Sequence, residues 1–127
     1  MSQAGQELQE QVTEALGGVA GLGVFPLAPV QAACPFATVD AGLETDWGHK
    51  SGVGREVRLA VTIRDRAERP DRIQSLEDQA LAAIERSGGV TPNWAVVSMS
   101  FMRSRTVRES ATGWAAVIEF RARMLRL

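Results

Sequence analysis

The sequence predicts an α+β domain in which two helices cover one face of a largely antiparallel four-stranded sheet. Two segments repeat apolar residues with the period of a helix, and two pairs of longer segments alternate apolar and polar residues with the period of a strand. Their order along the chain is helix, strand hairpin, helix, strand hairpin. With 127 residues, 45% of them hydrophobic, the chain fits a single domain over residues 1–127 with one core.

The first helix is predicted near the N-terminus, where apolar residues recur at helical spacing between Gln and Glu: Leu8, Val12, Ala15, Leu16 and Val19. Ser2 is a candidate for its N-cap, and Gly17 and Gly18 mark its end. A short extra strand is conceivable around Val24. Residues 27–35, LAPVQAACP, contain two prolines and are predicted to form an irregular connection.

The first hairpin is predicted from two segments that alternate apolar and polar residues. In residues 36–47 the apolar positions are Ala37, Val39, Ala41 and Leu43. Gly42 is expected to weaken this strand or to form a bulge. In residues 57–64 the alternation has no fault, with Val57, Leu59, Val61 and Ile63 expected to face the core. The stretch DWGHKSGVGR, residues 46–55, connects the two strands.

The second helix and second hairpin follow. The helix is predicted after Pro70, which suits a first helical turn, and before Gly88 and Gly89; its apolar positions are Ile73, Leu76, Ala80, Leu81 and Ile84. The hairpin is predicted from Trp94–Arg108 and Trp114–Leu127. Its core-facing residues are expected to be Ala95, Val97, Met99 and Phe101 on one strand and Trp114, Ala116, Ile118, Phe120, Ala122 and Met124 on the other.

The glycine-rich stretch does not have the pattern of a phosphate-binding loop or a catalytic site. A phosphate loop leads into a helix, whereas here Lys50-Ser51 precedes the last glycines and a strand follows. His49 beside Asp46 could act as a base and Cys34 or Ser51 as a nucleophile, but the chain specifies no geometry for them, and a solvated His49 is favoured. One cysteine and one histidine also give no zinc-ligand spacing. We therefore predict no catalytic residue, no cofactor and no metal.

Six arginines concentrate in the second hairpin: Arg103, Arg105 and Arg108 on its first strand, and Arg121, Arg123 and Arg126 on its second. They indicate either a solvated sheet face, paired locally with Glu109 and Glu119, or an interface. Arg103 and Arg105 lie an even number of residues beyond Phe101, so a regular strand would put them on the same face as Phe101. They are therefore expected where the strand leaves its own core. Trp47 and Trp94, near strand ends, are either lids of the core or contact anchors.

The sequence is also similar to a known family. The runs TDWGHKSGVGREVRLAVTIRDRAERPDRIQSLEDQALAAIE, WAVVSMSFMRSRTVRES and GWAAVIEFRARML resemble the tail-terminator (tail completion) proteins of long-tailed bacteriophages, especially those of alphaproteobacterial gene transfer agents. The early residues 24–27 and 35–39 resemble the family too, so the likeness covers nearly the whole chain. Its most distinctive phrase is Asp46-Trp47 followed by Lys50 and Gly52.

The resemblance implies a structural virion protein without catalysis. Such a protein caps the growing tail tube as a hexameric ring and joins the tail to the head–tail connector, with DNA passing through the lumen. Copies of itself, the tail tube protein and the connector would be its partners, and the glycine-rich loop would be a flexible tip that settles on one of them. We expect the interface to include Trp47, His49, Lys50, Arg55, Arg103, Arg105, Arg108, Arg121 and Arg123.

Composition agrees with this interpretation. The formal net charge of −1 leaves no general positive field that would grip DNA. The N-terminal residues lack a basic region followed by an apolar run, so we expect synthesis in the cytoplasm and no membrane contact before incorporation at the head–tail junction. Two alternatives remain: a small ligand-binding or sensor module, recognisable by a deep apolar pocket, and a minor enzyme that uses His49.

Overall fold

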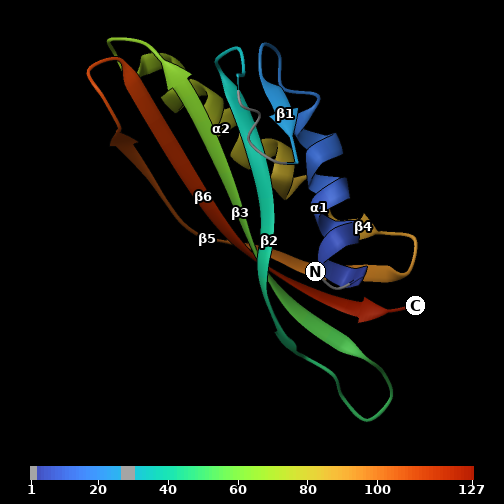
Figure 1. Cartoon of the computed structure of the whole chain (residues 1–127). Coiled ribbons are helices and arrows are strands. Elements are labelled where there is room, and N and C mark those ends of the chain that lie inside the picture. Colours follow the sequence, from blue (N-terminus) through green and yellow to red (C-terminus); the bar gives the residue numbers. More distant parts are fainter. Residues whose placement is uncertain (1–2, 27–30) are drawn as a thin grey trace.

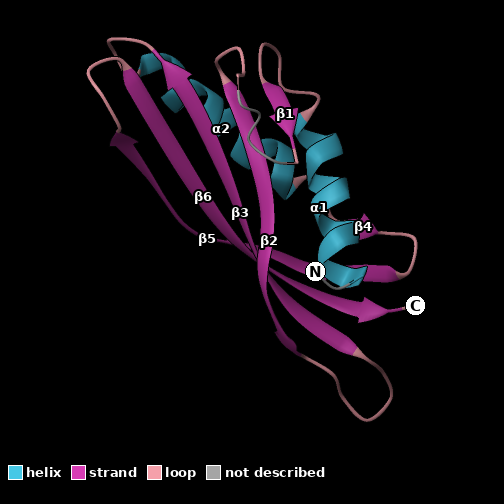
Figure 2. Ribbon diagram, in the orientation of Figure 1, coloured by secondary structure: helices cyan, strands magenta, loops and turns pink. Residues whose placement is uncertain are grey.

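The structure is a computed structural model that describes residues 3–26 and 31–127. Two helices, α1 (Gln3–Leu16) and α2 (Asp71–Glu85), lie on one face of a twisted, curled sheet of six strands (Figures 1 and 2). The strands are β1 (Gly23–Phe25), β2 (Phe36–Asp46), β3 (Gly54–Arg66), β4 (Gly89–Val90), β5 (Trp94–Arg108) and β6 (Gly113–Arg126).

The α+β class was predicted correctly, but the four-stranded sheet was wrong. The sheet order is β1-β2-β3-β6-β5-β4, so the four long strands of the two hairpins form its centre and a very short strand flanks each side. β1, at the place foreseen around Val24, runs parallel to β2, which makes the sheet mixed. β4 pairs with the start of β5 through Gly89 and Val90. Strands of two or three residues are too short to show a period in the sequence.

The helices appear where the apolar spacing predicts them. α1 buries Leu8, Val12 and Leu16 against β2, and α2 buries Ile73 and Ile84 against β3 and β6. Ser2, the expected N-cap of α1, lies outside the described residues, as do positions 27–30 of the predicted irregular connection. Positions 31–35 of that connection contain neither helix nor strand.

The core lies between the helices and the central strands β3 and β6. All four predicted core positions of β3 are buried, and on β6 five of the six are buried while Trp114 packs against the core. Phe120, opposite Leu59, is fully buried. Each such side chain contributes about 1.5 to 3 kcal/mol through the apolar surface it removes from water.

A bulge in β2 overturns one predicted core position. The ladder with β3 shifts by one residue between Ala41 and Leu43, at the glycine where a bulge was expected. Because one extra residue moves all later side chains to the opposite face, Leu43 faces away from the helices. The prediction of Leu43 as a core residue was wrong, since the side chain is 60% exposed.

Two register shifts in β5 have the same effect. The first, between Val96 and Ser98, puts Trp94 and Val96 toward the core, so the prediction of Ala95 and Val97 there was wrong. The second, between Phe101 and Arg103, separates the arginines from the apolar side of the strand.

Met99, between the two shifts, packs against the core as predicted. Phe101 lies opposite Phe120 but is 44% exposed, so its prediction as a core residue was wrong. The expected shared face of Arg103 and Arg105 with Phe101 was wrong: they stand opposite Glu119 and Val117 on the face without helices.

The short flanking strands leave much of the sheet open. β1 pairs only with Phe36–Thr38 of β2, and β4 pairs only with Ala95–Val96 of β5. In the described part of the chain, no further strand pairs with the outer sides of β2 beyond Thr38 or of β5 beyond Val96. The fold therefore presents three features for contact: the sheet face without helices, two strand edges, and the β2–β3 hairpin tip.

Candidate assembly surface

The sheet face without helices, called the uncovered face below, is dominated by paired charges. Toward the β2–β3 hairpin end of this face, Glu56 of β3 accepts a hydrogen bond from Nε of Arg123 at 3.2 Å and lies 3.7 Å from Nε of Arg121. Further along, Arg103 of β5 donates a hydrogen bond to Glu119 of β6 across the strand pair. The hydrogen bond from Arg103 lowers the pKa of Glu119, and the same bond raises the pKa of Arg103.

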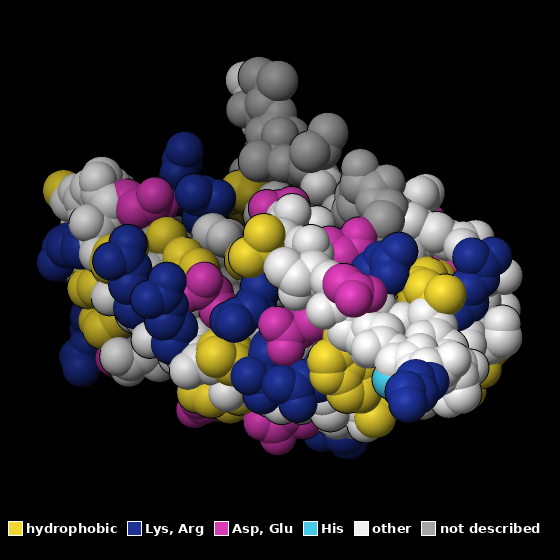
Figure 3. Space-filling model, turned by 90° about the horizontal axis from the view of Figure 1, so that it is seen from below, with side chains coloured by type: hydrophobic (Ala, Val, Ile, Leu, Met, Phe, Trp, Pro, Cys, Tyr) yellow, Lys and Arg dark blue, Asp and Glu magenta, His cyan; other side chains and the backbone are white. Residues whose placement is uncertain are grey.

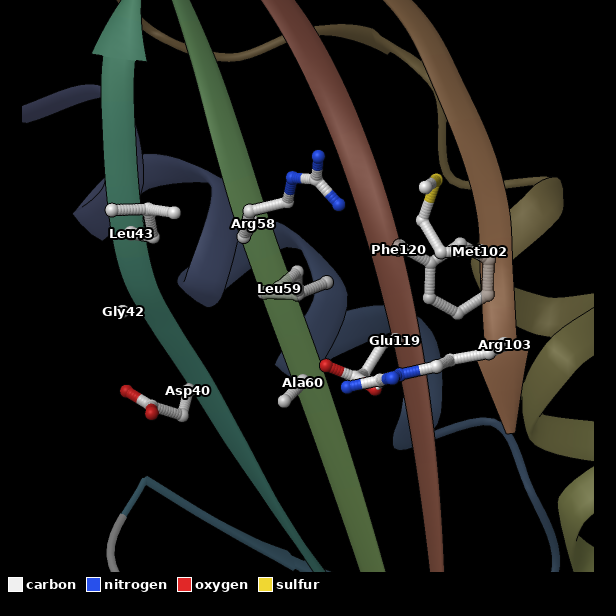
Figure 4. A pocket seen from close by; sticks show the side chains of 10 residues that line it. All are labelled: Asp40, Gly42, Leu43, Arg58, Leu59, Ala60, Met102, Arg103, Glu119 and Phe120. Atoms are coloured by element: carbon white, nitrogen blue, oxygen red, sulfur yellow. Dashed lines mark hydrogen bonds and ion pairs between the residues drawn. The ribbon is translucent and has the colours of Figure 1, made fainter. Parts of the chain in front are cut away.

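A groove of about 510 Å³ crosses all four long strands on this face (Figure 4). Asp40 and Leu43 line it from β2, Arg58 from β3, Glu119 from β6, and Met102 from β5. Figure 4 shows the Glu119 carboxylate beside the Arg103 guanidinium in this groove. The groove is an open channel crossed by an ion pair, which differs from the deep apolar pocket that a small-ligand module needs.

The glycine-rich stretch forms the tip of the β2–β3 hairpin, and backbone hydrogen bonds order it. His49 and Gly52 exchange two N–H···O bonds of 3.1 Å each, and the Trp47 amide donates to the Gly54 carbonyl at 3.0 Å. A Cβ at Gly54 would lie only 2.3 Å from the Trp47 carbonyl oxygen, so this position requires glycine. Beside the tip, the Arg126 amide of β6 donates to the Val53 carbonyl at 2.8 Å.

Two aromatic contacts hold Trp47 against the sheet. The Arg123 guanidinium lies 5.5 Å from the centre of the Trp47 ring, and the His49 ring meets Trp47 edge-on at 6.2 Å. On the opposite side of the hairpin, Arg55 lies 3.7 Å from the Asp46 carboxylate. His49 and Lys50 are exposed at the end of the molecule, where basic, acidic and apolar side chains are interspersed (Figure 3).

Arg108 belongs to the opposite end of the sheet. Its guanidinium donates to the carbonyls of Ser110 and Ala111 and lies 5.1 Å from the centre of the Trp114 ring. The Trp114 indole in turn donates to the Ala67 carbonyl at 3.0 Å. The predicted interface residues therefore do not form one patch: Trp47, Arg121 and Arg123 gather near the hairpin tip, Arg103 and Arg105 lie on the uncovered face, and Arg108 closes the far turn.

Sequence reasoning missed the apolar residues of this surface. Large apolar side chains are exposed on both open strand edges: Leu43 on β2, and Val97, Phe101 and Met102 on β5, at 60%, 52%, 44% and 40%. The register shifts put Leu43, Val97 and Met102 there, and of these shifts only the one at the β2 glycine gave a signal in the sequence. Trp94 is 4% exposed and acts as a lid of the core, whereas Trp47 is half-buried at the tip.

The described residues contain no group of three or more His, Cys, Asp or Glu side chains able to hold a metal ion. No helix among them is long and apolar enough to cross a membrane.

An α+β domain with one bare, ion-paired sheet face and two open edges defines a protein built to be bound by other protein subunits. The sequence profile of the family described as "Tail completion protein gp17" matches residues 8–125, and the chain belongs to this family of structural virion tail proteins. The resemblance found in the sequence is thereby confirmed.

Comparison with solved structures gives the same fold. A chain from the "Virion of native gene transfer agent (GTA) particle" superposes with a TM-score of 0.63 at 21% sequence identity, covering 95% of this chain and 93% of that one. A search of curated proteins found no match.

Proposed function

We propose that the chain terminates the tail tube as a ring, hexameric in the particle, and joins the tail to the head–tail connector, with DNA passing through the lumen. The family match carries this proposal. The particle would be a phage or a gene transfer agent, as the similar fold in such a particle suggests. Synthesis in the cytoplasm and incorporation at the head–tail junction follow from this role.

The uncovered face has the properties that a DNA-conducting lumen needs. Four of its arginines lie beside carboxylates: Glu56 pairs with Arg121 and Arg123, Glu119 with Arg103, and Glu109 lies 3.3 Å from Arg64. Paired charges keep such a surface hydrated and polar, and the carboxylates reduce the positive charge that it presents to the DNA backbone. DNA would therefore be held less strongly than by the same arginines without carboxylates.

The hairpin tip would contact the tube protein or the connector. His49 and Lys50 are exposed at the far end of the molecule, with the half-buried Trp47 and Arg55 on the strands beside them. Aromatic and arginine side chains are frequent anchors of protein interfaces. The tip is already hydrogen-bonded, so docking would cost less conformational entropy than ordering a flexible loop.

Removal of the chain from particle-producing cells tests the function. We expect DNA-filled heads without tails, and tubes of uncontrolled length, because nothing would stop subunit addition or join the two parts. A second strain should replace residues 48–52 with a two-residue turn, which leaves the domain folded and blocks joining. Normal joined particles in the first strain would refute the function, and normal particles in the second alone would refute only the role of the tip.

A further inference from the structure

We infer that the open edge of β2 in one copy of this chain pairs with the open edge of β5 in the next copy, which deepens the proposed ring by naming its subunit contact. The open edges are Ala41–Asp46 on β2 and Val97–Arg108 on β5. Just before the β2 edge, Gln9 of α1 donates its side-chain N–H to the Val39 carbonyl at 2.8 Å, so the helix covers that part. Beyond it, no other described strand pairs with the backbone edge.

Strand directions allow this pairing. β2, β3, β6 and β5 alternate in direction, so the two outer long strands run in opposite directions. A second copy related by rotation about an axis along the sheet therefore brings its β2 alongside β5 in antiparallel orientation. Six residues of β2 provide a contact about 20 Å long at roughly 3.4 Å per residue.

The two edges carry opposite charge. The open part of β2 and the residue just before it contribute Asp40, Glu44 and Asp46 and no basic residue, whereas β5 contributes Arg103, Arg105 and Arg108 and no acidic residue. On the uncovered face, an antiparallel register that sets Asp40 opposite Arg103 or Arg105 brings these opposite charges together, and it places Leu43 beside the Phe101 region of β5.

Apolar side chains on the same edges make self-pairing favourable. Leu43 on β2 and the exposed group Val97, Phe101 and Met102 on β5 would leave water when the edges meet. A long edge with apolar side chains is a template for another strand, and natural proteins protect such an edge unless it is used. Because the two edges differ, their pairing is head-to-tail and generates a ring once the rotation closes. Closure also requires staggered, tilted strands.

Charge reversal tests the contact. Asp40→Lys places a cation on the β2 edge, and Arg105→Glu places an anion on the β5 edge. Both side chains are exposed and have no hydrogen bond or ion pair to a described residue, although the charge of Arg105 also acts on Glu119. Circular dichroism and thermal melting should therefore verify that each variant keeps its fold. Matched controls are Glu14→Lys on α1 and Arg86→Glu on α2, which make the same charge changes on the helix layer.

Sedimentation velocity from about 10 μM to about 1 mM should measure the association, a range that detects contacts of micromolar to millimolar affinity. We expect each single variant to associate at least about tenfold more weakly than wild type, because like charges then face each other. An equimolar mixture of the two should regain association, since the introduced lysine meets the introduced glutamate and the remaining edges are native. The controls should behave as wild type.

Three outcomes would overturn the edge contact: wild type that stays monomeric throughout this range, single variants that associate normally, or a mixture that regains nothing. The last result would arise if β5 paired with β5, or if another surface joined the copies. The proposed function is judged separately. If particles without the chain are joined normally, the tail role fails whatever the sedimentation shows; if either single variant supports joined particles, only the edge contact fails.

Discussion

Replacement of Gly54 by alanine tests how the hairpin tip is held. The added methyl group would lie 2.3 Å from the Trp47 carbonyl oxygen, so Trp47 must retreat by at least about 0.7 Å to reach the shortest contact that real Cβ atoms make. That movement breaks the hydrogen bond from the Trp47 amide to the Gly54 carbonyl and pulls the ring from Arg123. The first loss costs about 1 kcal/mol and the second about 0.5 to 1 kcal/mol.

The predicted cost of Gly54→Ala is therefore about 1.5 to 2 kcal/mol in the free energy of unfolding, measured by urea denaturation. Gly52→Ala is the matched control, because its added methyl group meets nothing within 4 Å and its φ is not in the left-handed region. That variant should be unchanged or slightly stabilised, since alanine restricts the unfolded chain. If the two variants differ by less than about 0.5 kcal/mol, the tip is not held as described.

Two further predictions concern polar links between distant elements. Burial acts to raise the pKa of Glu7, but hydrogen bonds from the side chain and backbone of Asn93 help to bring it below the ordinary 4.5. The lowered pKa of Glu7 stabilises the fold fully above the pKa of the unfolded chain, and this stabilisation is lost as the pH falls through the lower pKa of the folded chain. Wild type should therefore lose more free energy of unfolding than Glu7→Gln between about pH 6 and pH 3. Equal losses would refute this. Arg72→Ala should cost about 1 to 3 kcal/mol, because it strips both guanidinium hydrogen bonds from Asp65, a carboxylate only 2% exposed. Arg69→Ala, which breaks an exposed ion pair, should cost less than about 0.5 kcal/mol, and a similar cost for both variants in thermal unfolding would contradict the distinction.

The sequence was sufficient for the elements whose apolar pattern is long and uninterrupted. β3 alternates without a fault from Val57 to Ile63, and β6 has an apolar residue at every second position from Trp114 to Met124. These core residues were predicted correctly apart from the partial exposure of Trp114, although Ala115 on the other face of β6 is buried as well. The stripes of α1 and α2 were equally clear. These elements lie at the centre of the fold, where burial on one face forces the pattern on the sequence.

The outer strands β2 and β5 could not be predicted fully, because register shifts move their later residues from one face of the sheet to the other. A bulge needs one extra residue, and nothing in the composition near Phe101 distinguishes a bulged strand from a regular one. The ion pairs of Glu56 and Glu119 join residues on different strands, so they depend on a register that the sequence did not specify. Trp94 could not be assigned either, because a tryptophan at a strand end fits a core lid and a contact anchor equally well.

The register shifts have a physical consequence for assembly. If β2 and β5 were regular, Leu43 would point toward the helices, and Arg103 would share the helix side with Phe101; both strands would then look like ordinary core strands with polar outer faces. The bulges instead move Leu43 and Met102 to the open side and set Arg103 opposite Glu119, where the arginine is fixed by a hydrogen bond. They also add twist to the outer strands, which a sheet needs before its edges can meet those of neighbouring copies in a closed wall. Deletion of Gly42 should remove the β2 bulge while Leu43 stays on the open side, because Leu43 then follows Ala41 directly at the position opposite Arg58. Weaker association of this variant in sedimentation velocity would therefore report the loss of the added twist, and unchanged association would show that the twist of β2 is not needed.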